Sequence, residues 1–391
     1  MRDVYVAGIG ITSFTRLEYP LVEIAAYPGL IALRDSGLKS IDQLYVANMG
    51  AGRVNGQTGL ASAVVDHLSL TPAGAATIEN GPASGASAIK EGFLAVASGF
   101  HDVVMVIGAE RMREVNALEA TDFVATLTHP LAEYIYGVTL PSLAGMFARL
   151  YMEKYGVTSR HLGMVAVKNH HNAMENFFAH LHEEISLAGI LDSPEASTNN
   201  PFVADPLRFY DVCPVSDGGA CIILASAEVM KKLNKPMIRL AGIGQATDTH
   251  AVHERKDPTD LLAVREAARQ AFAMAKVGPK DVDVAELHDA FTILEIAESE
   301  EVGFFKKGEG HLALEKGLTA LGGKIPINSS GGLKAKGHPV GATGVGQAHE
   351  IVLQLRGEAR KRQVKNARIG FTCNFGGFGN NVVCCTFIRE A

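Results

Sequence analysis

The leading candidate for chemistry is His338, which lies in the segment GGLKAKGHPVGATG at residues 331–344. Glycines let the backbone approach a ligand closely, and a histidine held rigidly in such a loop is well placed for proton transfer. Imidazole titrates close to neutral pH, so His338 is a candidate general base. A histidine that only packs against the start of a helix is the alternative that this segment leaves open.

A second histidine, His288, follows the alternating run VDVAEL and opens the segment HDAF. The alternation predicts a short strand, so His288 is expected at a strand end that faces a pocket. A histidine that only caps Asp289 is the structural alternative. The segment CNFGGFG at residues 373–379 adds Cys373 and Asn374, but glycine turns are common, and this segment indicates little by itself.

The five cysteines predict neither a disulfide framework nor a metal site. Their number is odd, and no C-x-x-C spacing occurs. Cys373 is a candidate acid-base group or displaced nucleophile, with a small buried apolar role as the alternative. The other four are expected in the core: Cys213, Cys221, Cys384 and Cys385. The histidine pairs at 170–171 and 180–182 lack the spacing of a helical zinc site, so no metal is expected.

The elements that must position these residues occur twice along the chain. The run VYVAGIGIT at residues 4–12 returns in kind as IRLAGIGQA at 238–246, each a β-branched run with Gly-x-Gly. Residues 77–99 predict a strand, a glycine-rich turn and a helix, and residues 326–357 repeat this plan with a longer turn. The glycines are expected to serve tight turns. The repeat predicts a duplicated α/β fold with a mostly parallel sheet covered on both faces.

The two predicted halves span residues 1–230 and 237–391, and the Lys-, Asn- and Pro-containing stretch between them marks the boundary. The first half carries about a hundred extra residues, roughly 111–217, with a helical pattern. Such an excursion from a regular scaffold is typical of an inserted lid or loop subdomain that carries binding residues.

Composition excludes several classes of function. The chain has 391 residues, 47% of them hydrophobic, and 36 Lys+Arg against 42 Asp+Glu give a net charge of −6. The sequence has no Lys/Arg-rich run of the kind that binds nucleic acid or an anionic membrane. The N-terminus lacks a signal-type apolar region, and no apolar run reaches the length that spans a bilayer. A cytoplasmic protein is expected.

Four segments together resemble the thiolase superfamily: ENGPASG at 79–85, HDAF, the GHP segment and CNFGGFG. The resemblance covers essentially the whole chain and is strongest to the archaeal, bacterial and sterol-carrier-type subgroup with HDAF. It implies a duplicated five-layer α/β/α/β/α fold with an inserted loop subdomain. It also implies that His338 is the base, that His288 holds a thioester oxygen, and that Asn374 lines the same pocket. The remaining positions implied to contact substrate or coenzyme A are Ser84, Gly85, Phe291, Gly337, Gly376 and Gly377.

The sequence departs from this family at the first loop. Pro82 occupies the position of the family's nucleophilic cysteine, and proline cannot be acylated. Proline is favourable in the first turn of a helix, so the fold is expected to survive the change. Ser84 is a poor substitute, because nothing in the local sequence supplies an adjacent base.

The resemblance implies an enzyme that makes or breaks a carbon–carbon bond in a CoA thioester. The leading interpretation is thiolytic (retro-Claisen) cleavage of a β-keto acyl-CoA without an acyl-cysteine at residue 82. Retro-aldol cleavage of a β-hydroxy acyl-CoA is one alternative, and a non-catalytic subunit that supports an active partner is another. Coenzyme A enters as substrate, and no bound cofactor is expected. The resemblance further implies a homodimer and a small partner that combines a zinc ribbon with an OB fold.

Overall fold

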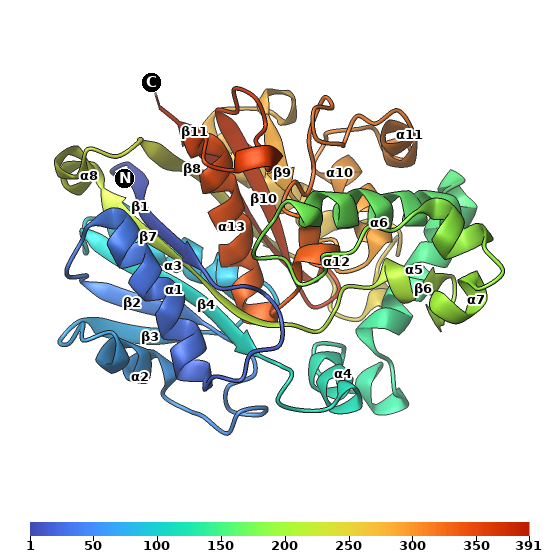
Figure 1. Cartoon of the computed structure of the whole chain (residues 1–391), viewed down its shortest axis with the longest axis horizontal. Coiled ribbons are helices and arrows are strands. Elements are labelled where there is room, and N and C mark those ends of the chain that lie inside the picture. The colour runs from blue at the N-terminus through green and yellow to red at the C-terminus, as the bar shows by residue number, and fades with distance from the viewer. Residues whose placement is uncertain (391) are drawn as a thin grey trace.

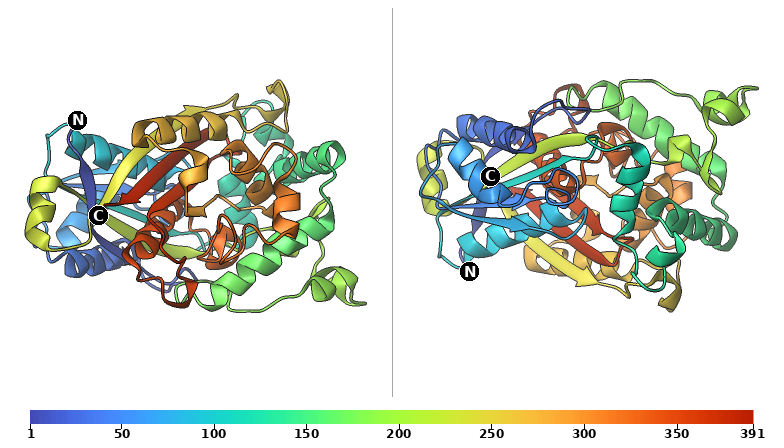
Figure 2. Two further views of the ribbon diagram at one scale, coloured as in Figure 1. Left: turned by 90° about the horizontal axis from the view of Figure 1, so that it is seen from above. Right: turned by 90° about the horizontal axis from the view of Figure 1, so that it is seen from below.

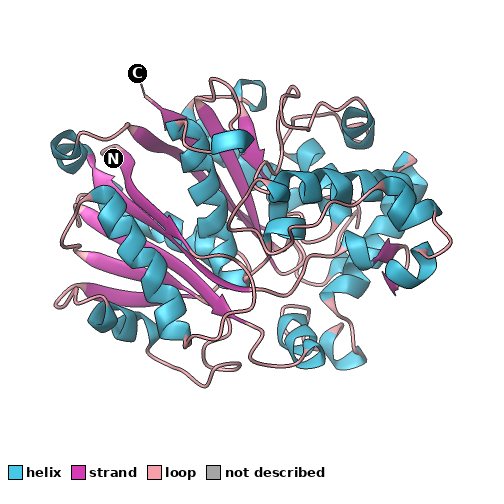
Figure 3. Ribbon diagram, in the orientation of Figure 1, coloured by secondary structure: helices cyan, strands magenta, loops and turns pink. Residues whose placement is uncertain are grey.

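A computed structural model describes residues 1–390, which form a mixed sheet of nine strands in the order β3-β2-β4-β7-β1-β8-β11-β10-β9 (Figure 3). The strands are β1 (Val4–Ile11), β2 (Gln43–Ala47), β3 (Gly74–Ile78), β4 (Val103–Arg111), β7 (Asp217–Ser226), β8 (Ile238–Thr247), β9 (Val284–Glu286), β10 (Ile369–Gly376) and β11 (Asn381–Arg389). A separate pair, β5 (Phe202–Ala204) and β6 (Leu207–Arg208), lies in the insertion.

The strand order confirms the predicted duplication. The series β3-β2-β4-β7-β1 is mirrored by β9-β10-β11-β8, and the two halves meet where Tyr5 of β1 pairs with Arg239 of β8. In the second half an isolated bridge between Ala285 and Ile327 stands where the first half has β3. The expectation of a mostly parallel sheet is wrong. Parallel pairing is limited to β2 with β3 and β4, and β9 with β10, because the central strands all pair antiparallel.

Helices and strands form five layers: outer helices, the strands of the first half, central helices, the strands of the second half, and outer helices again. On the outer faces lie α1 (Leu21–Ser36), α2 (Leu60–His67) and α9 (Leu262–Ala275). Between the halves lie α3 (Ser84–Ala97) and α13 (Val340–Arg356), which pack against each other and share one apolar core with strands of both halves. Figure 2 shows the strands of the two halves diverging from the junction inside the sheet where β1 pairs with β8. The short α8 (Ala227–Leu233) stands at the junction.

The glycines of the repeated Gly-x-Gly runs were expected to form tight turns. They lie instead inside strands, where they allow a helix to pack closely. A Cβ atom on Gly10 of β1 would lie 2.1 Å from the carbonyl oxygen of Pro28 in α1. Its counterpart Gly244 of β8 would place a Cβ 1.9 Å from the carbonyl oxygen of Ala267 in α9. Only glycine lets each outer helix approach its strand this closely.

The insertion folds as a helical layer over the second half of the molecule. It contains α4 (Ala117–Ala125), α5 (Leu140–Tyr155), α6 (Ser159–Met174) and α7 (Ala196–Asn199). Helix α6 contacts three elements of the second half: α10 (Thr292–Glu301), α11 (Gly310–Glu315) and α12 (Gly332–Lys336). Figure 1 shows this green segment lying beside the orange one. An excursion from the first half therefore covers the second half, where both candidate histidines lie.

None of the helices in residues 1–390 is long and apolar enough to cross a membrane. Over the same residues, no group of three or more His, Cys, Asp or Glu side chains could hold a metal ion.

Candidate active site

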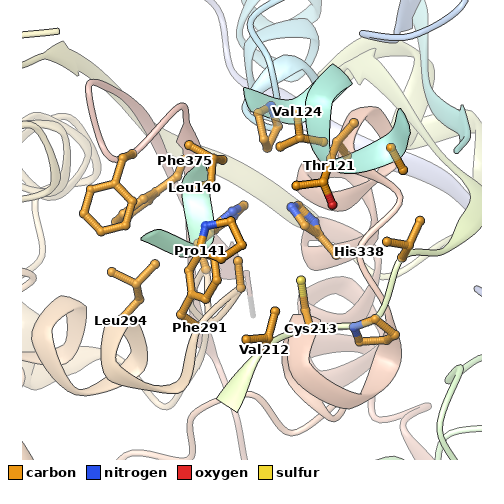
Figure 4. A pocket seen from close by; sticks show the side chains of 18 of the residues that line it. Thr121, Val124, Leu140, Pro141, Val212, Cys213, Phe291, Leu294, His338 and Phe375 are labelled. Carbon is orange, nitrogen blue, oxygen red and sulfur yellow. The ribbon is translucent and has the colours of Figure 1, made fainter. Parts of the chain in front are cut away.

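A cavity of about 150 Å³ lies between the insertion and the end of the sheet. Its walls come from three parts of the chain: the loop before α3, the insertion, and the HDAF, GHP and CNFGGFG segments. The lining is largely apolar, and Figure 4 shows Phe291, His338 and Cys213 pointing into it. The lining residues are Pro82, Met112, Ala120, Thr121, Val124, Leu140, Pro141, Val212, Cys213, Pro214, Val215, His288, Ala290, Phe291, Leu294, His338, Val340, Phe375, Gly377 and Phe378.

His338 is held at the start of α13 with one ring nitrogen free for the cavity. Its backbone N–H donates to the Ser216 hydroxyl at 3.3 Å. Its Nδ1 lies 2.6 Å from the Thr343 hydroxyl, which donates its own proton to the Pro339 carbonyl at 3.0 Å. With that proton donated to Pro339, we assign the ring hydrogen to Nδ1, which leaves Nε2 as an unprotonated acceptor. Burial lowers the pKa of His338 to about 3, so the ring is neutral at pH 7.

His288 has the opposite arrangement. Its Nδ1 lies 3.1 Å from the amide nitrogen of Asn374, which can only donate. The amide oxygen of Asn374 accepts the Ala86 N–H at 3.4 Å, which fixes the orientation of the amide. Nδ1 is therefore the acceptor, and Nε2–H remains as a donor. The ring stacks on Phe375 with centroids 5.2 Å apart, and burial and the His338 ring hold the pKa of His288 well below its usual value.

The two rings form a donor and an acceptor side by side. Their centroids lie 5.0 Å apart at an interplanar angle of 87°, and His288 and His338 are only 3% and 8% exposed. In an apolar cavity, a fixed N–H donor stabilises an oxyanion strongly because no water competes for it. The neighbouring acceptor can take a proton from a group bound at the same place. This arrangement suits enolate chemistry next to a carbonyl.

Pro82 lines the cavity, but it does not open a helix as predicted. Helix α3 begins at Ser84 with Ala83 as its N-cap, so Pro82 precedes the helix. The Ser84 hydroxyl is used within this turn, since it donates to the Gly81 carbonyl at 2.5 Å and accepts the Asn80 N–H at 2.8 Å. Gly85 allows α3 to meet α13, because a Cβ there would lie 2.9 Å from the Gly344 nitrogen. Neither Ser84 nor Gly85 lines the cavity.

Some residues of the CNFGGFG segment and of the neighbouring loops line the cavity, and others do not. Gly377 lines the cavity together with Phe291 of the HDAF segment, whereas Gly337 and Gly376 do not line it. Cys373 does not line the cavity: it pairs across the sheet with Cys384, and its thiol contacts Glu298. Burial raises the pKa of the Cys373 thiol well above its usual value.

The cavity also contains a residue that sequence reasoning placed in the core. Cys213 was expected in an apolar strand, but it lies in the loop before β7 and lines the cavity. Its backbone N–H donates to the Ala290 carbonyl at 3.0 Å, two residues after His288. The following Pro214 was a usable signal, because proline does not occur inside a paired central strand. Cys221, Cys384 and Cys385 are buried in the core as predicted.

Comparison with known proteins places this geometry in a family. The thiolase N-terminal domain matches residues 14–228, and the thiolase C-terminal domain-like family matches residues 244–389. An acetyl-CoA acetyltransferase of Methanothermobacter thermautotrophicus is 43% identical over 100% of both chains. The benzoylsuccinyl-CoA thiolase subunit BbsB of Thauera aromatica is 33% identical over 96% of this chain and 95% of its own.

Two solved structures share the fold at lower identity. An Ltp2-ChsH2(DUF35) aldolase superposes with a TM-score of 0.83 and 24% identity over 100% of this chain and 99% of that one. Human mitochondrial 3-ketoacyl-CoA thiolase in complex with CoA gives 0.72 and 16% over 100% and 98%. With both family domains matched in order along nearly the whole chain, this protein belongs to the thiolase family.

Proposed function

We propose that this protein is a thiolase-family enzyme that acts on a CoA thioester and breaks or makes the carbon–carbon bond next to it, without an acyl-enzyme at residue 82. The observation that carries this proposal is the pair of complementary histidines, His288 as donor and His338 as acceptor, beside a proline in one cavity. The family match and the acetyl-CoA acetyltransferase relative support CoA thioesters as the substrate class.

In the thiolytic direction, His338 Nε2 takes the proton of the CoA thiol, and the sulfur attacks the β-keto carbon directly. The alkoxide that forms collapses and breaks the bond between the α and β carbons. The bonding electrons move into the departing CoA thioester as an enolate, whose oxygen accepts the His288 Nε2–H. Protonated His338 then returns its proton to the α carbon of the enolate, and two CoA thioesters result. No group of the protein is acylated, which agrees with Pro82 in place of a nucleophile.

Pro82 also supports a second candidate, retro-aldol cleavage of a β-hydroxy acyl-CoA, because this reaction needs no nucleophile. His338 would then take the hydroxyl proton, and the products would be an aldehyde or ketone and one CoA thioester. The enolate and the role of His288 are the same in both reactions.

We also propose that the protein functions with a small partner of the zinc-ribbon and OB-fold type that completes the CoA site. Two comparisons support this proposal. The BbsB relative is named as a subunit, and the Ltp2 structure is a complex with a DUF35 protein.

Product analysis tests these proposals. The protein, with its partner present, is incubated with β-keto acyl-CoAs plus CoA, and separately with β-hydroxy acyl-CoAs. Thiolysis gives two CoA thioesters with sequential kinetics and no added mass on the intact protein. An aldehyde or ketone product selects the retro-aldol reaction instead. An acyl adduct on any residue contradicts the non-covalent mechanism, and no product from either class indicates a non-catalytic subunit.

A further inference from the structure

Helix α6 of the insertion presents buried amide side chains to the second half of the molecule, and none of them lines the cavity. Asn172 donates to the carbonyl of Asn328 at 3.0 Å, which fastens the helix to the loop before the GHP segment. Asn169, which is 0% exposed, has different partners. Its contacts lead to the two histidines of the candidate site.

The side-chain amide of Asn169 bridges two buried carboxylates. Its nitrogen donates to Oδ2 of Asp289 at 2.7 Å and to Oε2 of Glu295 at 2.9 Å. Its oxygen accepts from the Lys168 ammonium at 2.6 Å, and because an ammonium can only donate, this contact fixes which way the amide points. Asn169 thus holds side by side two acidic groups that would otherwise repel each other.

Asp289 in turn joins the two histidine segments. It directly follows His288 in the HDAF segment, and its Oδ1 accepts the backbone N–H of Leu333 at 2.6 Å. Its Oδ2 accepts the N–H of Lys334 at 3.3 Å. Both donors lie in α12, which ends two residues before His338. One side chain therefore ties the backbone beside the donor histidine to the helix before the acceptor histidine.

Two glycines let the GHP segment approach this link. Gly332 has a φ of +60°, and a Cβ on it would lie 2.2 Å from Oδ2 of Asp289. A Cβ on Gly331 would lie 2.8 Å from that of Ala173 in α6. Figure 1 shows α6 and α12 side by side. A side chain at either glycine would push the GHP segment away from α6 and from Asp289.

We propose, on the basis of the proposed function, that Asn169 is a positioning residue that acts through Asp289 to set the spacing of the two histidine rings. The donor on His288 and the acceptor on His338 must face the same substrate group, and a displacement of about 1 Å can lower a rate ~10²-fold. Without the Asn169 amide, one oxygen of Asp289 loses a donor and lies beside Glu295 with nothing between them. The insertion therefore fixes the geometry of the site in addition to lining the cavity.

Steady-state kinetics with acetoacetyl-CoA and CoA, with the partner present, tests this proposal. Asn169→Ala should lower kcat by about 10–10²-fold, and KM should stay unchanged because no substrate contact is lost. Asn172→Ala is the matched control: it removes a buried amide from the same helix, and it should lower the melting temperature but keep the wild-type kcat. Asp289→Asn breaks the link at its other end, so the double variant with Asn169→Ala should be no slower than Asp289→Asn alone.

A second measurement does not depend on the substrate. In protein whose histidines carry an NMR-active nitrogen isotope, the ring signals of His288 and His338 report tautomer and hydrogen bonding, and the two His→Ala variants assign them. Asn169→Ala should shift both signals, whereas Asn172→Ala should leave them in place. Asp289→Asn should shift them as well, which keeps the test open if Asn169→Ala does not fold.

The outcomes separate this inference from the proposed function. A lower kcat and shifted ring signals in Asn169→Ala, with neither change in Asn172→Ala, support the inference. Wild-type kcat and ring signals in Asn169→Ala overturn it, and the proposed function stands. An equal loss of kcat in Asn172→Ala also overturns it, because the cause would be a general loosening of α6. A wild type inactive on every β-keto and β-hydroxy acyl-CoA contradicts the proposed function, and the ring signals then decide the inference by the same comparison.

Discussion

The two histidines of the site have the same side chain, but the hydrogen bond at Nδ1 gives each a different role. At His338 the partner is a hydroxyl whose proton is already donated, and at His288 it is an amide N–H. The first partner leaves an acceptor at Nε2 and the second leaves a donor. The residues that set these tautomers, Thr343 and Asn374, are therefore positioning residues.

Single substitutions test these roles. His338→Ala should lower the turnover number by about 10²–10⁴-fold, and His288→Ala by about 10²–10³-fold, because the proposed mechanism uses these residues as base and oxyanion donor. Binding of the CoA thioester should persist in both variants. His171→Ala, at an exposed position, is the matched control. Steady-state kinetics with any partner present measures the turnover number of each variant. Unchanged turnover in both histidine variants would contradict the catalytic assignment.

The acid side of the pH profile is a second test at the residue scale. Because burial lowers the pKa of His338 to about 3, its basic form should persist well below pH 6. The ratio kcat/KM should therefore show no inflection near ~6.5, the value for an exposed histidine. The unfolded chain binds this proton below ~6.5 and the folded chain does not, so stability falls as pH falls. Circular dichroism must show that the protein stays folded. An inflection near ~6.5 would contradict a buried neutral base.

At the scale of elements, the repeated glycines show what the sequence pattern could and could not predict. The repeat of a β-branched run with Gly-x-Gly identified β1 and β8 as equivalent strands, which the sheet order confirms. It did not reveal why glycine was needed, because the neighbour of Gly244 is a helix about two dozen residues away in sequence. A contact distant in sequence leaves no local signal.

Alanine at these positions should be costly. The Cβ of Gly244→Ala would lie 1.9 Å from a backbone oxygen of α9, and that of Gly10→Ala 2.1 Å from one of α1. Helix and strand must separate, so each variant should lose at least about 1–3 kcal/mol of unfolding free energy. Gly52→Ala is the control, since no atom lies within 4 Å of its added Cβ. Denaturant titration measures all three, and equal stability of Gly244→Ala and Gly52→Ala would refute the packing explanation.

The candidate site was predictable to the extent that it depends on short segments of distinctive sequence. The GHP and HDAF segments identified both histidines, which the fold brings together across fifty residues of sequence. Cys213 and the apolar wall were missed, because a loop inside an insertion has no periodicity that reveals which side chains face a cavity. The sequence also failed to predict that most neighbouring strands of the sheet pair antiparallel. Apolar runs identify strands, but strand direction depends on connections that the pattern does not specify.

At the scale of the whole molecule, the cavity exists only because the halves and the insertion meet. The first half supplies Pro82, the second half supplies both histidines, and the insertion supplies Leu140 and Cys213. Phe147 of α5 packs edge-on against Phe378 of the C-terminal loop with centroids 5.8 Å apart, which ties the insertion to the site. Neither half could form this cavity alone.

The open edge of the sheet leads to the last prediction, a two-fold dimer. The apolar run of β4 is not an edge of the sheet, because β2 and β7 flank it. The exposed edge is β3, where Ala75 and Thr77 are exposed. An uncovered edge strand with small, uncharged side chains invites pairing with a second copy. We expect β3 of one subunit to lie beside β3 of the other.

Charge placed on this strand should separate the subunits. In Ala75→Lys and Thr77→Lys, the two-fold axis brings each new ammonium close to its own copy, and like charges at a strand interface are destabilising. The dimer dissociation constant should rise at least about tenfold, which corresponds to ~1.4 kcal/mol. Ser62→Lys, an equal charge at an exposed position of α2, should leave the dimer intact. Sedimentation velocity at micromolar concentration measures the mass of each species, and a monomeric wild type would show that β3 is protected in another way.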